Sequence, residues 1–448
     1  MAHRILIGNG KIVNEGHITE ADILIEDGFI SEITTSNQSS NQTYDEFFDA
    51  SGLLIFPGFI DTHVHFREPG LTHKADIRSE SMAAAAGGVT SFMEMPNTKP
   101  PTVSQELLDQ KLNIAKENSV VNYSFFVGAT NDNAEEILGL DFSKIGGIKV
   151  FMGSSTGNML VNNPKTLETL FSNSPVPIAV HCESESIIKA ETERFKEIYG
   201  ENPPFSIHEH IRSAKACIES TTLAVDLAKQ TGARLHVTHV STKSELKLFD
   251  NNTPLHNKKI TAEAVVPHLW FSDNDYQKLG ARIKCNPSIK TRNDRNTIRK
   301  ALNNNTIDSI ATDHAPHLLQ EKNMPYFQCP SGMPSIQFSA IAVMELCKKN
   351  IIPITTMATK MCHAPAIIFN IEKRGFIRTG YHADLAFINP NKKQKITDKK
   401  VISKCGWTPF DGLVFSSKVV ATMVNGKFVF KNEIFTQNKC AEQLTFKQ

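Results

Sequence analysis

The alternation of short apolar segments with helical stretches constrains the fold of this chain more than any other feature. Eight segments have strand-like composition: 59–66, 88–95, 122–129, 146–153, 176–183, 233–241, 260–266 and 309–316. Stretches between them, such as HKADIRSESMAAAAGG and ESTTLAVDLAKQTG, have helical composition. Strands that alternate with helices in this number predict an α/β chain folded as a (β/α)8 TIM barrel.

An open, doubly wound parallel sheet would produce the same alternation. Its nucleotide-binding versions carry a GxGxxG or GxxxxGK[ST] loop directly after a strand. Neither motif follows any of the eight segments. The barrel is therefore favoured over the open sheet.

Both ends of the chain differ from its middle. They consist of short β-rich segments, with Asp27-Gly28 and Asn425-Gly426 placed as tight hairpin turns. The whole chain has 448 residues, well above the roughly 250 that a single barrel needs. We therefore expect a barrel domain over residues 56–369 and one small discontinuous β-sandwich domain over residues 1–55 and 370–448.

Charge and cysteine content exclude several classes of protein. The chain has 48 basic and 47 acidic residues, a net charge of +1, which argues against binding to nucleic acid or to an anionic membrane. It contains no signal peptide and no run of 18 apolar residues, so we expect a cytoplasmic protein. The eight cysteines form no CxxC pair, which favours reduced, buried thiols.

Metal-capable side chains lie on five of the eight predicted strands. His63 and His65 alternate on the first strand and so face the same side, while His181, His239 and Asp313 lie on the fifth, sixth and eighth. A single histidine on a strand is more often a hydrogen-bonded core residue. The ends of all barrel strands converge on one mouth, however, and this joint placement favours a site for zinc or a similar divalent ion.

Lys149 on the fourth strand, the remaining one of the five strands with a metal-capable side chain, has two interpretations. Its stem could be buried while its ammonium group reaches water. Alternatively, burial lowers its pKa and leaves a neutral amine that takes up carbon dioxide as a carbamate. A carbamate is a carboxylate that could bridge two cations, and a hydroxide shared by those cations is a strong nucleophile at neutral pH.

Asp313, in the motif TDHAPH, is a candidate for proton transfer. Beside a metal-bound water it could take up a proton as a general base and later donate it to a leaving nitrogen as a general acid. It could also serve only as a ligand.

Four further residues are candidates for substrate binding. Arg67 continues the alternation of His63 and His65, and its guanidinium suits bidentate capture of a carboxylate, although a salt bridge to a neighbour such as Glu68 is an alternative. Asn97, Asn286 and His317 follow the second, seventh and eighth strands. Each can form hydrogen bonds with a ligand, or serve only in a turn or in packing.

Longer motifs resemble the dihydroorotases of the amidohydrolase superfamily. They are PGFIDTHVHFREPG, GGVTSFMEMPNTKP, GGIKVFMG, HCESE, HVTHVST, CNPSIKTRNDR and IATDHAPH, and together with the split β domain they cover essentially the whole chain. HxH occurs in many amidohydrolases, whereas HVHFREPG and PNT are far more specific. The resemblance implies a zinc-dependent hydrolase that interconverts carbamoyl aspartate and dihydroorotate in pyrimidine synthesis, through attack by a metal-bridging hydroxide.

The resemblance also implies a role for each candidate residue. Two zinc ions per chain would be bound, one by His63 and His65 and the other by His181 and His239, with carboxylated Lys149 as their bridge and Asp313 as ligand and proton shuttle. The substrate carboxylate would contact Arg67, Asn97 and His317, and Asn286 would contact the ring amide. The histidine that matches the ligand position in HVTH is His239, because His236 faces the other side of the strand.

Two departures from the family pattern bear on the substrate. The chain has NPSIK where many members have NPPLR, and it lacks an aspartate after IKVFMGSS. It therefore resembles the lysine-bridged branch, to which hydantoinases and allantoinases also belong, and a cyclic amidase of that type is the nearest alternative. A catalytically inactive scaffold is disfavoured because all six ligand positions are filled. Family members often form homodimers or larger homo-oligomers.

The segment 318–333, LLQEKNMPYFQCPSGM, is a long loop after the eighth strand. It could be a mobile lid that excludes water from the site. An ordered structural loop is an equal alternative.

Overall fold

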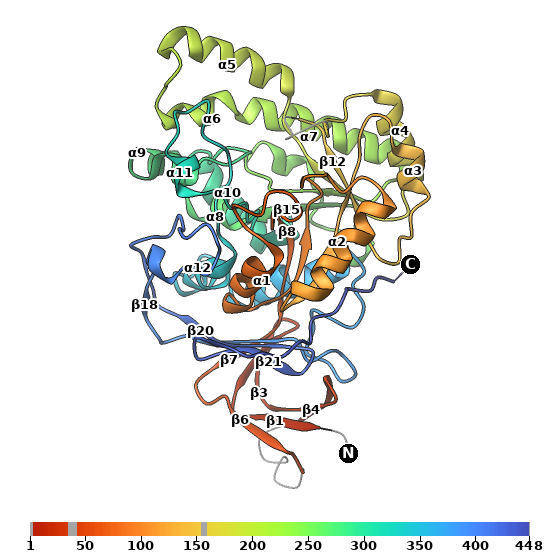
Figure 1. Cartoon of the computed structure of the whole chain (residues 1–448), viewed down its shortest axis with the longest axis vertical. Helices are drawn as coiled ribbons and strands as arrows, with labels where there is room; N and C mark the ends of the chain where they lie inside the picture. Colours follow the sequence, from red (N-terminus) through yellow and green to blue (C-terminus); the bar gives the residue numbers. More distant parts are fainter. Residues whose placement is uncertain (1–2, 35–42, 154–158, 448) are drawn as a thin grey trace.

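The barrel occupies the centre of the computed structural model, which describes residues 3–34, 43–153 and 159–447 (Figure 1). Its parallel strands follow chain order: β8 (Phe59–Val64), β9 (Val89–Glu94), β10 (Asn122–Phe125) with β11 (Val127–Gly128), β12 (Ile148–Phe151), β13 (Ile178–His181), β14 (Leu235–Val237), β15 (Ile260–Val265) and β16 (Ser309–Ala311). A parallel bridge between Val64 and His314 joins β8 to the segment after β16. This sequential order confirms the TIM barrel and excludes the open sheet.

Helices cover the outside of the barrel (Figure 1). The longer ones are α1 (Ile77–Ala86), α2 (Gln105–Asn118), α4 (Pro164–Asn173), α5 (Glu185–Tyr199), α7 (Ala214–Thr231), α10 (Arg292–Asn303) and α12 (Ile336–Lys348). Shorter ones are α3 (Ala134–Leu138), α6 (His208–Ile211), α8 (Val266–Trp270), α9 (Tyr276–Leu279), α11 (Leu319–Lys322), α13 (Ile354–Ala358) and α14 (Ala364–Ile368). Helices α1, α2 and α7 begin after Asp76, Ser104 and Ser213, whose side chains accept a hydrogen bond from a free backbone N–H of the first turn.

Both ends of the chain contribute strands to a β sandwich below the barrel (Figure 1). One sheet, in the order β5-β4-β1-β6, consists of β1 (Arg4–Gly8), β4 (Asp22–Glu26), β5 (Phe29–Thr34) and β6 (Glu46–Asp49). The other, β22-β21-β20-β17-β7-β2-β3, joins β2 (Lys11–Asn14), β3 (His17–Glu20) and β7 (Leu54–Pro57) to β17 (Leu385–Asn389), β20 (Lys418–Val424), β21 (Lys427–Lys431) and β22 (Ile434–Phe435). Apolar residues from both ends, including Ile7, Ile23, Ile55 and Phe387, pack in a single core between the sheets. The predicted discontinuous sandwich is confirmed.

The two predicted hairpin turns are confirmed, and they contact each other. Asp27 and Gly28 have φ values of 50° and 88°, and Asn425 and Gly426 have values of 48° and 76°. A side chain on Gly426 would place its Cβ 2.6 Å from the Cα of Gly28, so this approach requires glycine. Turns that lie almost 400 residues apart in the sequence (28 and 426) are thus packed together.

Parts of the C-terminal stretch lie against the barrel rather than within the sandwich. The backbone N–H of Tyr123 on β10 donates to Glu442 at 3.1 Å, and that of Leu444 donates back to Tyr123 at 2.9 Å. The indole Nε1 of Trp407 donates to the carbonyl of His317 at 2.7 Å. We propose domain limits of 1–55 and 370–448 for the sandwich and 56–369 for the barrel, with these segments as the contact between the two domains.

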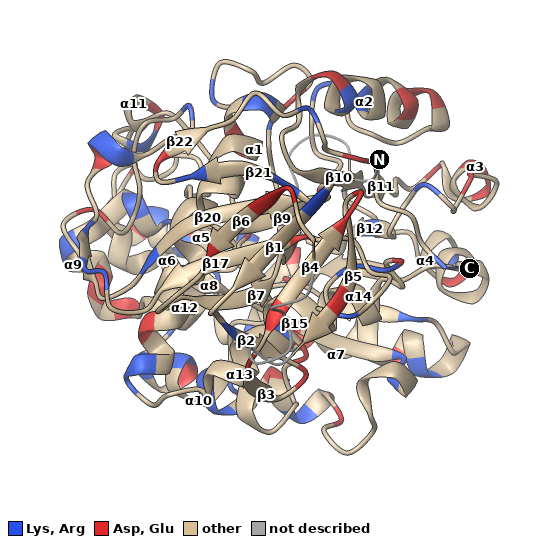
Figure 2. Cartoon of the chain, turned by 90° about the horizontal axis from the view of Figure 1, so that it is seen from below, with Lys and Arg blue, Asp and Glu red and all other residues tan. Residues whose placement is uncertain are grey.

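Charges and cysteines are distributed as the composition predicts. Seen from below the sandwich, basic and acidic positions are interspersed over the helices (Figure 2). All eight cysteines lie in the described part of the chain and none of them forms a disulfide. Among the described residues, no helix combines the length and the apolar character that crossing a membrane requires.

Candidate metal centre

A cavity of about 820 Å³ opens at the carboxyl ends of the barrel strands. All ten of the predicted site residues line it: His63, His65, Arg67, Asn97, Lys149, His181, His239, Asn286, Asp313 and His317. The structure therefore brings the whole predicted set together in the place where TIM-barrel enzymes carry their active sites.

Several of these residues lie beyond the strands on which they were predicted. β8, β14 and β16 end at Val64, Val237 and Ala311, so the simple alternation of side chains does not extend to Arg67. Instead, Arg67, His239 and Asp313 adopt left-handed φ values of 71°, 41° and 48°. Non-glycine residues rarely adopt this conformation, and it concentrates at functional sites. The turned backbone directs these side chains into the cavity.

His63, His65 and Asp313 form a group with the geometry of a cation site. Asp313 Oδ1 lies 3.4 Å from His63 Nε2 and 3.1 Å from His65 Nε2. The other ring nitrogens face oxygens of Glu263 at 2.9 Å and Asn97 at 2.7 Å. When Nδ1 of each ring donates its proton to these oxygens, both Nε2 lone pairs point at the Asp313 carboxylate. Three acceptors this close repel one another unless a cation lies between them, so the residues fit a metal ion.

A second pair of histidines lies beside this group. His181 Nδ1 and His239 Nε2 are 2.9 Å apart, and the rings of His63 and His239 have centroids 5.2 Å apart. His239 Nδ1 is buried and has no hydrogen-bond partner among the residues that the structure describes. Burial lowers the pKa of His65 to about 4 and also lowers the pKa values of His181 and His239. All three rings are thus neutral at pH 7, as metal coordination requires.

Lys149 does not reach solvent, because only 1% of its surface is exposed. Its Nζ donates to Thr238 Oγ1 at 3.1 Å, and in the described part of the chain it forms no ion pair. Burial lowers its pKa to about 8. The interpretation with a solvent-exposed ammonium group is therefore wrong, and the neutral amine that carbamate formation needs is accessible near neutral pH.

The lowered pKa of Lys149 predicts that carbamate formation, and with it zinc binding, depends on pH. The amine of Lys149 is about 10% neutral at pH 7 and about 90% neutral at pH 9, given a pKa near 8. We expect zinc and carbon dioxide, at fixed dissolved CO2, to restore activity to the metal-stripped protein several-fold faster at pH 9 than at pH 7. Recovery that is independent of both pH and CO2 would contradict carbamate formation.

The cavity wall beside Arg67 is basic. Arg67 is buried, its Nε donates to the carbonyl of Pro316 at 3.1 Å, and its guanidinium lies 3.1 Å from His317 Nε2. Lys74, which the sequence analysis missed, also lines the cavity and places Nζ 3.1 Å from His317 Nδ1. Burial and these two cations lower the pKa of His317, and a neutral ring can accept a hydrogen bond from only one of them. Lys74 is also paired with Glu321, whose carboxylate oxygens lie 3.3 Å from Lys74 Nζ and 3.4 Å from His317 Nδ1.

No carboxylate pairs with Arg67 in residues 3–34, 43–153 or 159–447. The alternative of a salt bridge is therefore not observed: Glu68 accepts from the backbone of Ile77, and Asp76 pairs with Lys404. Asn286 also lines this cavity, and its buried Oδ1 has no hydrogen-bond partner in the described part of the chain. Asn97 also forms a contact that was not predicted. Its Oδ1 lies 2.7 Å from Nδ1 of His65 and holds that ring in place.

The segment 318–333 forms part of the cavity wall and is held by two buried lysines. Lys322 Nζ donates to the carbonyls of Lys284, Pro330 and Gly332 at 3.2, 2.8 and 2.9 Å. Lys284 Nζ donates to the carbonyls of Tyr326 and Cys329, both at 2.6 Å. These contacts favour the ordered loop over the mobile lid.

A further carboxylate contacts the site from below. Glu263, in the middle of ITAEAVV on β15, is completely buried and accepts from His63 Nδ1. The only signal in the sequence was an acidic residue inside an apolar strand.

His236 is absent from the residues that line the cavity, as predicted. Its ring contacts Thr261 at 2.8 Å and packs against Phe369.

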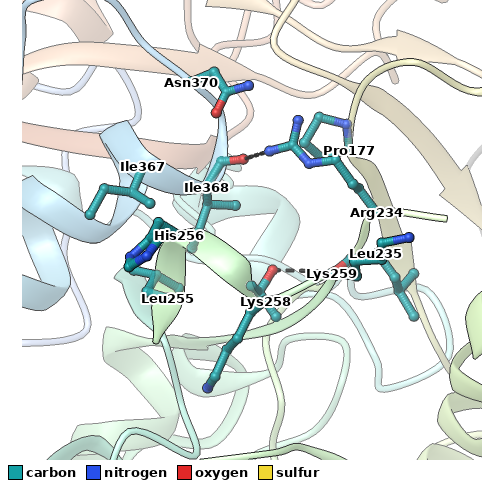
Figure 3. Close-up of a pocket in the computed structure, with 11 residues that line it drawn as sticks. Pro177, Arg234, Leu235, Leu255, His256, Lys258, Lys259, Ile367, Ile368 and Asn370 are labelled. Carbon is teal, nitrogen blue, oxygen red and sulfur yellow. Dashed lines mark hydrogen bonds between the residues drawn. The ribbon is translucent and has the colours of Figure 1, made fainter. Parts of the chain in front are cut away.

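A smaller cavity of about 230 Å³ opens at the opposite end of the barrel, beside the residues that precede β13, β14 and β15 (Figure 3). It is basic, but its more buried cations are engaged within the protein. Arg234 donates to the carbonyl of Ile368 at the end of α14, and Lys258 pairs with Asp308 at 2.7 Å. With His256 as its one potential metal ligand among the residues that line it, this cavity does not compete with the first as the candidate site.

Comparisons with known proteins agree with this geometry. The amidohydrolase family matches residues 54–429. The dihydroorotase of Methanosarcina acetivorans is 32% identical over 91% of this chain and 88% of its own length, and that of Lactobacillus acidophilus is 31% identical over 96% and 99%. The solved L-hydantoinase (dihydropyrimidinase) of Arthrobacter aurescens superimposes with a TM-score of 0.94 at 25% identity, over 99% of this chain and 100% of that one. This chain therefore belongs to the amidohydrolase family.

Proposed function

We propose that this protein is a dihydroorotase, which reversibly cyclises N-carbamoyl-L-aspartate to L-dihydroorotate. The observation that carries the proposal is the buried guanidinium of Arg67, which lines the cavity and has no carboxylate partner among the described residues. An unpaired buried cation is costly, and a substrate carboxylate would offset that cost. Dihydroorotate has a ring carboxylate, whereas hydantoin and allantoin have none. The sequence relatives with this name support the same assignment.

The ligand set proposed for the metal centre is His63, His65, His181, His239, Asp313 and carboxylated Lys149, and two zinc ions fit its nitrogen and oxygen donors. Such ions would lower the pKa of a bound water and polarise the amide carbonyl. In this mechanism Arg67, Asn97 and His317 hold the substrate carboxylate, and Asn286 orients the ring amide. The Asp313 carboxylate accepts the proton of the attacking water and returns it to the leaving nitrogen.

A hydantoinase or allantoinase is the second candidate function. It is favoured by the solved L-hydantoinase, whose fold matches over its whole length. Fold similarity alone does not determine the substrate, since one fold supports many reactions. The guanidinium of Arg67 would find no carboxylate in such a substrate.

Turnover of dihydroorotate, hydantoin and allantoin by one purified sample, together with its metal content, tests the proposal. We expect a clear preference for dihydroorotate and about two zinc ions per chain. If the protein binds metal but does not turn over dihydroorotate, the proposed metal ligands would stand and the substrate would be another cyclic amide. The homo-oligomeric state and the cytoplasmic location stay predictions.

A further inference from the structure

One buried carboxylate links the two halves of the proposed metal centre. Glu263 Oε1 accepts from His63 Nδ1 at 2.9 Å and from the backbone N–H of His239 at 3.3 Å. Its other oxygen, Oε2, accepts from Thr62 Oγ1 at 3.1 Å and lies 3.4 Å from His236 Nε2. A single side chain on β15 thus contacts residues of β8 and residues of the β14 strand and its following turn.

The contact with His63 determines which ring nitrogen faces the cavity. A carboxylate that accepts from Nδ1 holds the proton there and leaves the Nε2 lone pair free for a metal ion. It also makes this nitrogen a better donor to the metal, because the negative charge polarises the ring.

The contact with His239 acts on the backbone rather than on the ring. His239 has a φ of 41°, a left-handed conformation that costs free energy for a residue with a side chain. The hydrogen bond from its N–H to Glu263 Oε1 stabilises this conformation, which directs the imidazole towards His181. The same oxygen therefore supports one histidine of each pair.

We propose that Glu263 is a positioning residue that supports both halves of the metal centre at once. It touches neither substrate nor metal, because it is completely buried and does not line the cavity. Its negative charge lies directly beneath the histidines and favours cations in the positions above them.

Replacing Glu263 by glutamine tests this proposal with little change in shape. The amide oxygen of glutamine can still accept from His63 Nδ1 and the His239 N–H, so the substitution removes mainly the charge. We expect affinity for zinc, measured by competition with a chromophoric chelator, to fall about 10–100-fold for both equivalents. The melting temperature of the metal-free variant should stay within a few degrees of that of the parent.

Glu245→Gln is the matched control. Glu245 is also buried, but it accepts from Thr221 and Thr242 and does not line the cavity. Its replacement should leave both zinc affinities within about twofold of the parent.

If Glu263→Gln fails to fold, Thr62→Val is the second variant. It removes one donor to Oε2 and should still lower the affinity for both zinc ions several-fold. Unchanged zinc binding, or weakening of one ion alone, would overturn the proposal.

Discussion

Replacing Arg67 by methionine is expected to raise KM for dihydroorotate by about 100-fold or more and to leave the zinc content unchanged. The guanidinium would form two charge-assisted hydrogen bonds to the substrate carboxylate, each worth roughly 1.5–3 kcal/mol. Each loss of about 1.4 kcal/mol is a factor of ten in kcat/KM. Methionine fills most of the same buried volume, so the barrel should remain intact. Steady-state kinetics and metal analysis of one sample check both parts.

Lys99 provides a control for charge alone. It lines the same cavity but is exposed, so its charge is screened by solvent. Lys99→Met should change KM by less than about threefold, as exposed charges usually do. If Arg67→Met behaved like Lys99→Met, Arg67 would not hold the substrate, and a neutral cyclic amide would become the better candidate.

Replacing Lys149 by alanine is expected to abolish most activity, by about 1000-fold or more, because a centre without its bridge loses metal and its activated water. The buried space that the side chain leaves can admit a short carboxylic acid, whose two oxygens can replace those of the carbamate. Acetate or propionate should therefore restore part of the activity and part of the zinc. Full activity in Lys149→Ala would eliminate the carbamate bridge.

Lys360→Ala is the control for Lys149→Ala. It shows the effect of removing a buried lysine that is not part of the proposed metal centre. Lys360 is also buried, burial lowers its pKa to about 8, and its Nζ donates to Ile307 and Asn305 away from the cavity. The variant is expected to lose thermal stability but to keep its zinc and its turnover per folded molecule. A short carboxylic acid should have no effect on it.

The barrel could be predicted from the sequence because its signals are local. Apolar segments of strand length recur between helices with capping residues such as Asp76 and Ser104, and the hairpin turns carry Asp-Gly and Asn-Gly. The residues that line the cavity could be predicted for a related reason. In a barrel, the carboxyl ends of all strands lie at the same face. A residue at the end of a predicted strand can therefore be placed at that face from its sequence position alone.

Contacts between distant segments could not be predicted in this way. Glu263 and Lys74 reach the site through partners 200 and 243 residues away, and no local pattern records such a pairing. The left-handed turns at Arg67, His239 and Asp313 were also missed. Their residue types do not predict a positive φ, which is most common at glycine. The order of the segment 318–333 depends on carbonyls that accept from buried lysines, which only the folded chain reveals.

The mixed sheet of the sandwich has a consequence for synthesis on the ribosome. β7 ends at Pro57 and its neighbour β17 begins at Leu385, so roughly 330 residues must be translated between them. At about 5–20 residues per second this takes tens of seconds. Throughout that interval Ile7, Ile23 and Ile55 lack Phe387 and the other late partners of their core. The sandwich is therefore started before the barrel but completed only after it, and its early core residues lack these partners throughout the synthesis of the barrel.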